Sequence, residues 1–223
     1  MKITSSLAPY VMAALTILGS ITVNAGIINL MDNGSFEDIS NSVNIGGYGS
    51  SATWQIYSSI PSWNASNNVE IWSNNFIVSA YEGNRVLELN AHSSNANGEF
   101  SIFQSLSTEI GQTYELTFAG RRREANSDES FSVSIGDLFD SVHNQASGRW
   151  NEYSYRFTAL SNLSALTFTS LDGGRDKTGN IFDDVRVTTV STSVATSVPE
   201  PSTFAIFALG IMGLASRRFK KQS

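Results

Sequence analysis

The central part of this 223-residue sequence predicts an all-β fold, an antiparallel β-sandwich. Apolar and polar residues alternate with a period of two over residues 113–118, 131–135 and 153–157, which is typical of strands with one buried face. Clusters of Gly, Asn, Ser and Asp separate the apolar runs, and no long window before residue 199 shows the 3.6-residue period of a helix. Many short strands joined by turns are typical of sandwiches.

The last predicted strand, residues 181–187, places a carboxylate in an apolar row. In a regular strand Ile181, Asp183, Val185 and Val187 point to the same side of the sheet. A buried carboxylate without a partner is costly, so we expect a cation or hydrogen-bond donors beside Asp183.

Residues 1–25 have the features of an export signal. Lys2 gives a positive start, residues 11–23 are mostly apolar, and Val23-Asn24-Ala25 fits a small-x-small cleavage site. We therefore expect cleavage after Ala25. The alternative is a first core helix, but no capping signal precedes the segment.

The C-terminal tail combines three features in order. Pro199, Glu200 and Pro201 come first, an apolar run of twelve residues follows at 204–215, and four cations close the chain. The cations are Arg217, Arg218, Lys220 and Lys221. Twelve residues form about 18 Å of helix, less than the roughly 30 Å hydrocarbon core of a bilayer. The alternative is a buried C-terminal helix of the domain, although the run lacks an amphipathic pattern.

This order of features over residues 199–221 resembles the PEP-CTERM sorting signal of exported bacterial proteins. The resemblance implies recognition at the inner membrane, processing by an exosortase and transient anchoring by the C-terminal helix. Together with the export signal, it implies a protein sorted to the cell surface or released outside the cell. Residues 189–198 contain only Ser, Thr, Val and Ala, and we expect them to be a spacer between the domain and the tail.

The body between these ends, residues 26–188, is long enough for one domain with a single core. Without Lys2, Glu200 and the four C-terminal cations, the chain keeps 9 basic and 19 acidic residues and a net charge of −10. This charge argues against nucleic acid or anionic lipid as a partner of the body and is compatible with divalent cations and neutral polymers. The sequence has no cysteine, which excludes disulfides and Cys-ligated zinc.

A series of short motifs runs through residues 28–188. They are Asn33-Gly34-Ser35-Phe36-Glu37, Gly83-Asn84-Arg85, Gly111-Gln112-Thr113-Tyr114, Trp150-Asn151-Glu152-Tyr153 and Ile181-Phe182-Asp183-Asp184. Their order resembles that of galactose-binding-like jelly rolls, which include carbohydrate-binding modules and domains that start with an Asn-Gly-x-Phe-Glu motif. The resemblance implies a jelly-roll sandwich and a carbohydrate ligand.

The same resemblance implies a structural calcium site between the first motif and the last strand. Glu37 and Asp183 occupy the matching positions, with Asn33 and Asp184 as further candidate ligands. Calcium takes 6 to 8 oxygen ligands and accepts backbone carbonyls among them. The alternative is that Asp183 accepts hydrogen bonds from backbone N–H groups and binds no metal.

Aromatic residues in a loop-rich, nearly charge-free stretch are the candidate carbohydrate-binding face. Trp54, Tyr57, Trp63 and Trp72 are the predicted binding residues, with Tyr81 as a further candidate. Flat rings stack on the apolar C–H faces of sugars, and neighbouring Asn and Gln side chains can bond the hydroxyls. The alternative, which we favour for any single tryptophan, is that the ring fills the core. Trp150 begins an alternating strand, and we expect it to pack.

Catalytic signatures are absent from the sequence: it contains no Gly-x-Ser-x-Gly, His-Glu-x-x-His, phosphate-loop or dinucleotide motif. We therefore expect a non-catalytic protein that binds extracellular polysaccharide, in the biofilm-matrix setting that the PEP-CTERM resemblance implies. One alternative is a structural or adhesion protein that contacts other proteins without binding sugar specifically. Another is a glycan hydrolase, which would need two facing carboxylates.

Overall fold

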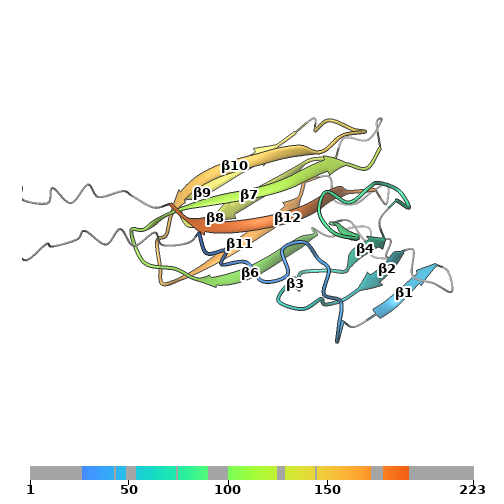
Figure 1. Cartoon of the computed structure of the whole chain (residues 1–223), viewed down its shortest axis with the longest axis horizontal. Helices are drawn as coiled ribbons and strands as arrows, with labels where there is room; N and C mark the ends of the chain where they lie inside the picture. Colours follow the sequence, from blue (N-terminus) through green and yellow to red (C-terminus); the bar gives the residue numbers. More distant parts are fainter. Residues whose placement is uncertain are drawn as a thin grey trace, which may run out of the picture.

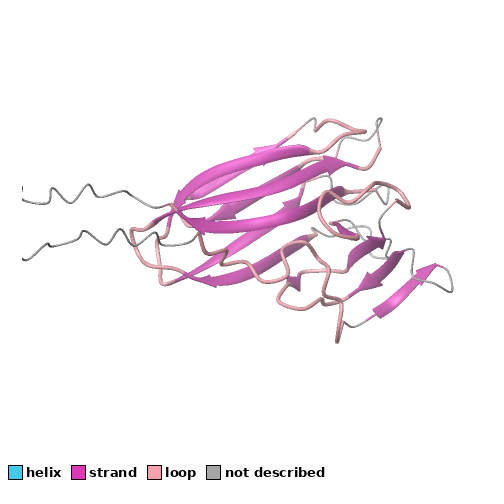
Figure 2. Cartoon of the chain, viewed as in Figure 1, coloured by secondary structure: helices cyan, strands magenta, loops and turns pink. Residues whose placement is uncertain are grey.

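A computed structural model describes residues 27–42, 44–48, 54–73, 75–89, 100–124, 129–143, 145–171 and 178–190. These residues form strands, turns and loops but no helix, as Figure 2 shows. None of them belongs to a helix with the length and apolarity of a membrane span. The predictions for residues 1–25 and for the tail from 191 onward lie outside the described residues.

The strands pair into two antiparallel sheets (Figure 1). The seven-stranded sheet has the order β1-β2-β4-β5-β12-β7-β10. Its strands are β1 Asn44–Tyr48, β2 Trp54–Tyr57, β4 Val69–Ser73, β5 Arg85–Glu88, β12 Asn180–Thr189, β7 Thr113–Arg122 and β10 Asn151–Thr158. The five-stranded sheet has the order β3-β6-β11-β8-β9. Its strands are β3 Asn64–Ala65, β6 Ser101–Ser107, β11 Leu163–Ser170, β8 Phe131–Ile135 and β9 Leu138–Val142.

The eight strands from β5 to β12 have jelly-roll connectivity. The chain alternates between the sheets, so that β5-β12-β7-β10 faces β6-β11-β8-β9, with β8 and β9 joined as a hairpin. The predicted antiparallel jelly roll is therefore confirmed. The stretch 54–73, expected to be rich in loops, instead forms strands β2, β3 and β4, which extend both sheets at one side. Strand β12 ends one residue inside the predicted spacer, at Thr189.

The main core lies between the sheets and is rich in aromatic rings. Phe118, Phe131, Phe168 and Phe182 are buried and contact one another with ring centroids 4.8 to 6.2 Å apart. The alternating residues of the predicted strands supply this core, because every second side chain of a strand points to the same side. The period-two windows thus identified the inward faces correctly.

The last strand departs from regular alternation at a β-bulge. Its register against β7 shifts between Asp183 and Arg186, and Asp184 has a φ of 50°. The bulge divides the expected apolar row: Val185 and Val187 lie in the main core, whereas Ile181 belongs to a separate apolar cluster. The prediction that Ile181 shares a face with these two valines is wrong, because the extra residue of the bulge shifts the alternation.

The first motif lies directly against this bulge. The N–H of Val185 donates to the Gly34 carbonyl oxygen at 2.9 Å, and Phe36 is fully buried with its ring centroid 5.5 Å from that of Trp63. A Cβ on Gly34 would stand 2.0 Å from the backbone oxygen of Val185, so only glycine permits this approach. The N-terminal segment and the last strand are therefore neighbours, as the resemblance implies.

Candidate functional site

A loop of residues 75–84 covers part of the outward face of the seven-stranded sheet. Trp72, Val86 and Ile181 are buried on that face, while their neighbours Ile71 and Leu87 belong to the main core. The loop adds its buried Val78 and its partly buried Ile77 and Ala80 to the same cluster. An apolar contact therefore holds the loop against the sheet.

Two carboxylates fix the end of this loop. Asp183 Oδ2 accepts hydrogen bonds from the N–H groups of Tyr81 and Glu82, at 2.8 and 3.0 Å, and its Oδ1 accepts one from the N–H of Asp184 at 2.7 Å. Glu37 Oε1 accepts from the N–H groups of Asn84 and Arg85, both at 2.6 Å. The two predicted metal ligands therefore act on one loop, and the backbone N–H alternative describes Asp183.

Gly83 is required between these anchors. Its φ is +67°, and a Cβ would stand 2.5 Å from Glu37 Oε1. Glycine adopts this left-handed conformation without steric cost. The Gly83-Asn84-Arg85 motif thus contacts the Glu37 end of the first motif.

The Asp183 carboxyl group is fully buried, and its burial raises its pKa to about 7. The hydrogen bonds from the N–H groups of Glu82, Asp184 and Tyr81 oppose this shift, and the nearby charge of Asp184 adds to it. The loop anchor is consequently a group whose charge changes near neutral pH.

The four predicted metal ligands do not form a calcium shell. The Asn33 side chain donates to the carbonyl oxygens of Asp38 and Pro61, and Asp184 forms an ion pair with Arg186. Asp183 is buried against N–H donors, and Glu37, whose side chain is 32% exposed, accepts two N–H groups with one oxygen. No group of three or more Asp, Glu or His side chains that could hold a metal occurs in the described part of the chain. This donor set does not fit calcium, and calcium binding by the protein stays a prediction.

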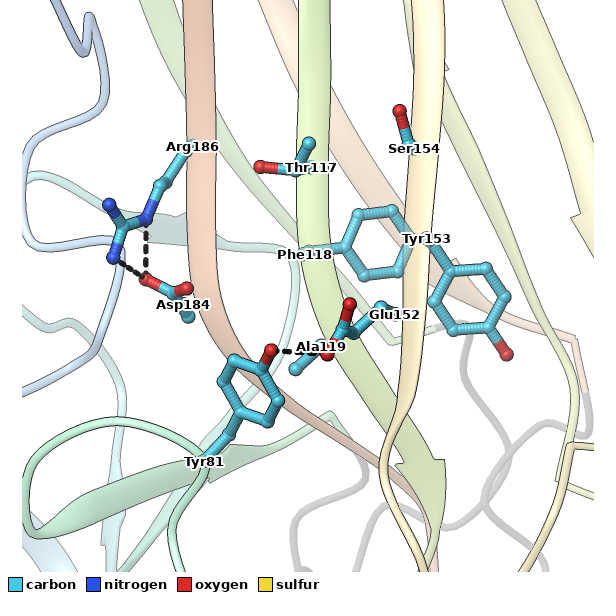
Figure 3. A pocket seen from close by; sticks show the side chains of 9 residues that line it. All are labelled: Tyr81, Thr117, Phe118, Ala119, Glu152, Tyr153, Ser154, Asp184 and Arg186. Atoms are coloured by element: carbon cyan, nitrogen blue, oxygen red, sulfur yellow. Dashed lines mark hydrogen bonds and ion pairs between the residues drawn. The ribbon is translucent and has the colours of Figure 1, made fainter.

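A pocket of about 420 Å³ lies beside the loop on the outward face of the seven-stranded sheet (Figure 3). Strands β7, β10 and β12 form its floor, and Tyr81 of the loop stands at its edge. Its lining residues are Tyr81, Thr117, Phe118, Ala119, Glu152, Tyr153, Ser154, Asp184 and Arg186.

Tyr81 is held at three points. Its N–H is bound by Asp183, its hydroxyl donates to Glu152 Oε1 at 2.6 Å, and its ring meets Trp150 edge-on with centroids 6.0 Å apart. The hydrogen bond to Glu152 raises the pKa of Tyr81, so the phenol stays neutral. The Trp150 ring nitrogen in turn donates to the Ser79 carbonyl oxygen at 3.0 Å. An exposed aromatic ring is thereby fixed in orientation at the pocket.

An ion pair also lines the pocket. Arg186 Nε and Nη2 both lie 2.7 Å from Asp184 Oδ1, and this hydrogen bond raises the pKa of Arg186. A second pocket of about 320 Å³ begins on the far side of this pair, and its lining includes Asn33, Gly34 and Ser35 of the first motif together with Asp184. The ion pair therefore separates two adjoining hollows.

Three of the four predicted carbohydrate-binding rings are core residues. Tyr57, Trp63 and Trp72 are each only 3% exposed. The Trp63 ring nitrogen donates to the Asn33 carbonyl oxygen at 3.0 Å, and Trp72 stacks between Trp54 and Phe76. Rings buried on both faces offer no surface to a sugar, so the core alternative applies to these three. Trp54 is half-buried.

The structure brings Tyr81 together with residues that sequence reasoning did not select. Glu152, Ser154 and Arg186 occupy outward positions of β10 and β12, where alternation places polar side chains. The alternation of the sequence predicts that these polar side chains point outward. It does not predict that Tyr81, on a loop distant in the sequence, lies next to them. Trp150, expected to pack, is half-buried and supports Tyr81.

Residues 29–188 match the profile of a family described as "Protein of unknown function (DUF642)", and residues 197–221 match the PEP-CTERM protein-sorting motif. The latter implies export and sorting to the cell surface. No curated protein matches the sequence.

Similar solved structures include three carbohydrate-binding modules. TmCBM61 in complex with β-1,4-galactotriose is 15% identical, with 73% of this chain and 99% of that chain covered and a TM-score of 0.43. A CBM4 structure is 14% identical, with 71% and 99% covered and a TM-score of 0.39. The CBM22-1 xylan-binding domain of Paenibacillus barcinonensis Xyn10C is 17% identical, with 59% and 87% covered and a TM-score of 0.37. At these identities and TM-scores the likeness identifies no ligand for this chain.

Proposed function

Because the chain belongs to the DUF642 family and ends in a PEP-CTERM sorting motif, we propose that it is an exported protein that binds extracellular polysaccharide at the cell surface without cleaving it. Before processing its partner would be an exosortase, and after processing it would be the polysaccharide of the biofilm matrix. Its C-terminal helix would anchor it in the membrane until processing.

The fixed Tyr81 ring beside the pocket is the observation that carries this proposal. The side chain is 41% exposed although its backbone and its hydroxyl are both held, so one surface of the ring remains available. A ring held in place loses little conformational entropy when a ligand stacks on it. Convergent polar groups around a partly apolar pocket are typical of small-molecule and sugar sites.

The polar groups around the ring suit the hydroxyls of a sugar. Glu152 offers carboxylate oxygens, Arg186 offers N–H donors, and Thr117 and Ser154 can both donate and accept. The pocket holds two carboxylates and one guanidinium, in a body with a net charge of −10. This charge disfavours acidic glycans and favours neutral ones.

The two carboxylates of the pocket support a non-catalytic role. Glu152 accepts the Tyr81 hydroxyl hydrogen, and Asp184 is bound by two nitrogens of Arg186. Glycoside hydrolysis needs one carboxyl group that donates a proton and a second that acts as base or nucleophile. Both groups here already have partners that hold them in another role.

Titration calorimetry of the purified full chain with soluble, neutral oligosaccharides tests this proposal. Tyr81→Ala should weaken binding about tenfold or more, because a central aromatic anchor is lost. Phe76→Ala is the matched control, since Phe76 lies on the same loop, is exposed, and does not line the pocket. Equal binding by wild type and Tyr81→Ala would refute the site, and release of reducing ends would refute the non-catalytic role.

A further inference from the structure

The outward face of the five-stranded sheet has an unusual composition: none of its described side chains is charged. Alternation along each strand gives the residues that point outward, and the register pairs outward residues with outward residues on the neighbouring strands. They are Asn64, Ser101, Phe103, Ser105, Ser107, Leu163, Ala165, Thr167, Thr169, Ser132, Ser134, Phe139 and Ser141, of which Ser132 and Thr169 are buried. We call this set the neutral face. The one acid on these strands, Asp140, lies on the inward side and accepts a hydrogen bond from the Tyr155 hydroxyl.

The opposite side of the sandwich differs sharply in charge. The outward positions of β7, β10 and β12 include Glu115, Arg121, Glu152, Arg156 and Arg186. The chain between its two terminal signals carries a net charge of −10. An uncharged sheet face on such an acidic body is therefore a local feature rather than a reflection of the overall composition.

Two phenyl rings lie in one cross-strand row of the neutral face. The register pairs Phe103 with Thr167, Thr167 with Ser134, and Ser134 with Phe139. Phe103 is 36% exposed and Phe139 is 72% exposed. Four neighbouring strands span about 14 Å, so the rings stand on either side of a strip of hydroxyl groups. Leu163, 63% exposed, lies on the same face.

We propose that the neutral face binds the surface of an insoluble, uncharged polysaccharide. This inference rests on the proposed polysaccharide partner and adds a second contact surface to it. Serine and threonine hydroxyls can exchange hydrogen bonds with sugar hydroxyls, and exposed phenyl rings can cover apolar C–H faces. No charge has to be desolvated when an uncharged polymer covers this face.

The negative charge of the body favours a neutral polymer over other occupants of the neutral face. A second copy would bring another body with a net charge of −10, and acidic polymers or anionic lipid would be repelled by the same body. A neutral polymer meets no such repulsion. Because the neutral face and the Tyr81 pocket belong to outward faces of different sheets, one molecule could hold a soluble chain and an insoluble surface together.

The test is retention of the full chain by particles of curdlan, a neutral insoluble glucan, compared with the same particles after carboxymethylation. Wild type should be depleted from solution by the neutral particles and at least about tenfold less by the carboxymethylated ones. Phe103→Ser/Phe139→Ser should lose about tenfold in affinity for the neutral particles, since both aromatic contacts are removed. Ser105→Asp, which places a charge at an exposed position of the face, should have the same effect.

Matched control variants test whether the loss of retention is specific to the neutral face. Ile110→Ser removes an exposed apolar side chain from a loop, and Ser58→Asp adds a charge at an exposed position outside the neutral face; both should be retained like wild type. Tyr81→Ala should also be retained on particles while losing soluble oligosaccharides, so the two sites fail separately. Unchanged retention of the double phenylalanine variant would overturn the inference. Conversion of a wild-type dimer to a monomer by that variant, measured by light scattering, would also overturn it, because the occupant would then be a second copy.

Discussion

Replacement of Asp183 by alanine is expected to destabilise the fold and to release the loop that carries Tyr81. The change removes the acceptors of three backbone N–H groups, those of Tyr81, Glu82 and Asp184. An unsatisfied buried donor costs about 1–3 kcal/mol, and water can reach the loop residues after the change, so we take about 1 kcal/mol for each. The expected loss is about 3 kcal/mol in the free energy of unfolding, since the three contributions are of similar size.

Urea unfolding followed by tryptophan fluorescence measures this loss. Asp38→Ala is the matched control: its carboxylate is exposed and accepts a hydrogen bond from the N–H of Ser40 at 2.8 Å, so we expect less than about 1 kcal/mol. Asp183→Ala should also weaken binding of soluble glycan, while Asp38→Ala should not. The reasoning is refuted if the two variants lose equal stability.

Three further predictions follow from the same contacts. The pKa of Asp183 is about 7 in the folded protein against 3.8 for the free group, so the folded state binds a proton that the unfolded state has lost between about pH 4 and 7. The stability that this group contributes therefore falls as pH rises over that range, and the stability advantage of wild type over Asp183→Asn should shrink. An advantage that grows with pH would contradict the raised pKa. Gly34→Ala should lower the free energy of unfolding by about 3 kcal/mol or more, because its Cβ would stand 2.0 Å from the Val185 backbone oxygen. The control Gly46→Ala, whose Cβ has its nearest contact at 3.7 Å, should lower it by less than about 1 kcal/mol in the same urea assay. The sequence predicts that calcium raises the melting temperature, whereas the N–H contacts of Glu37 and Asp183 predict the same melting temperature in excess calcium and in excess chelator; melting curves under both conditions decide between the two.

The jelly-roll core could be predicted because the alternation that specifies it lies within single short segments of the sequence. Alternation over the β7, β8 and β10 segments sets which side chains point inward, and large aromatic residues at those positions fill the core. The bulge at Asp184 could not be predicted in the same way. It lies where Gly34 approaches Val185, a contact between segments far apart in the sequence.

The candidate site was only partly predictable for a related reason. The sequence pointed to Glu37 and Asp183 as a pair that joins the first motif to the last strand, and the structure does place both at one loop. Composition does not reveal that backbone N–H groups donate to both carboxylates. Trp63 and Trp72 illustrate the same limit, because a ring suited to stack on sugar is equally suited to fill a core.

A crystal structure of the protein with a bound neutral oligosaccharide tests the central claim most directly. The account predicts a sugar ring against Tyr81, with hydroxyl groups within hydrogen-bond distance of Glu152 and Arg186. An ordered sugar over Trp54 and Phe76, with the Tyr81 pocket empty, would contradict it.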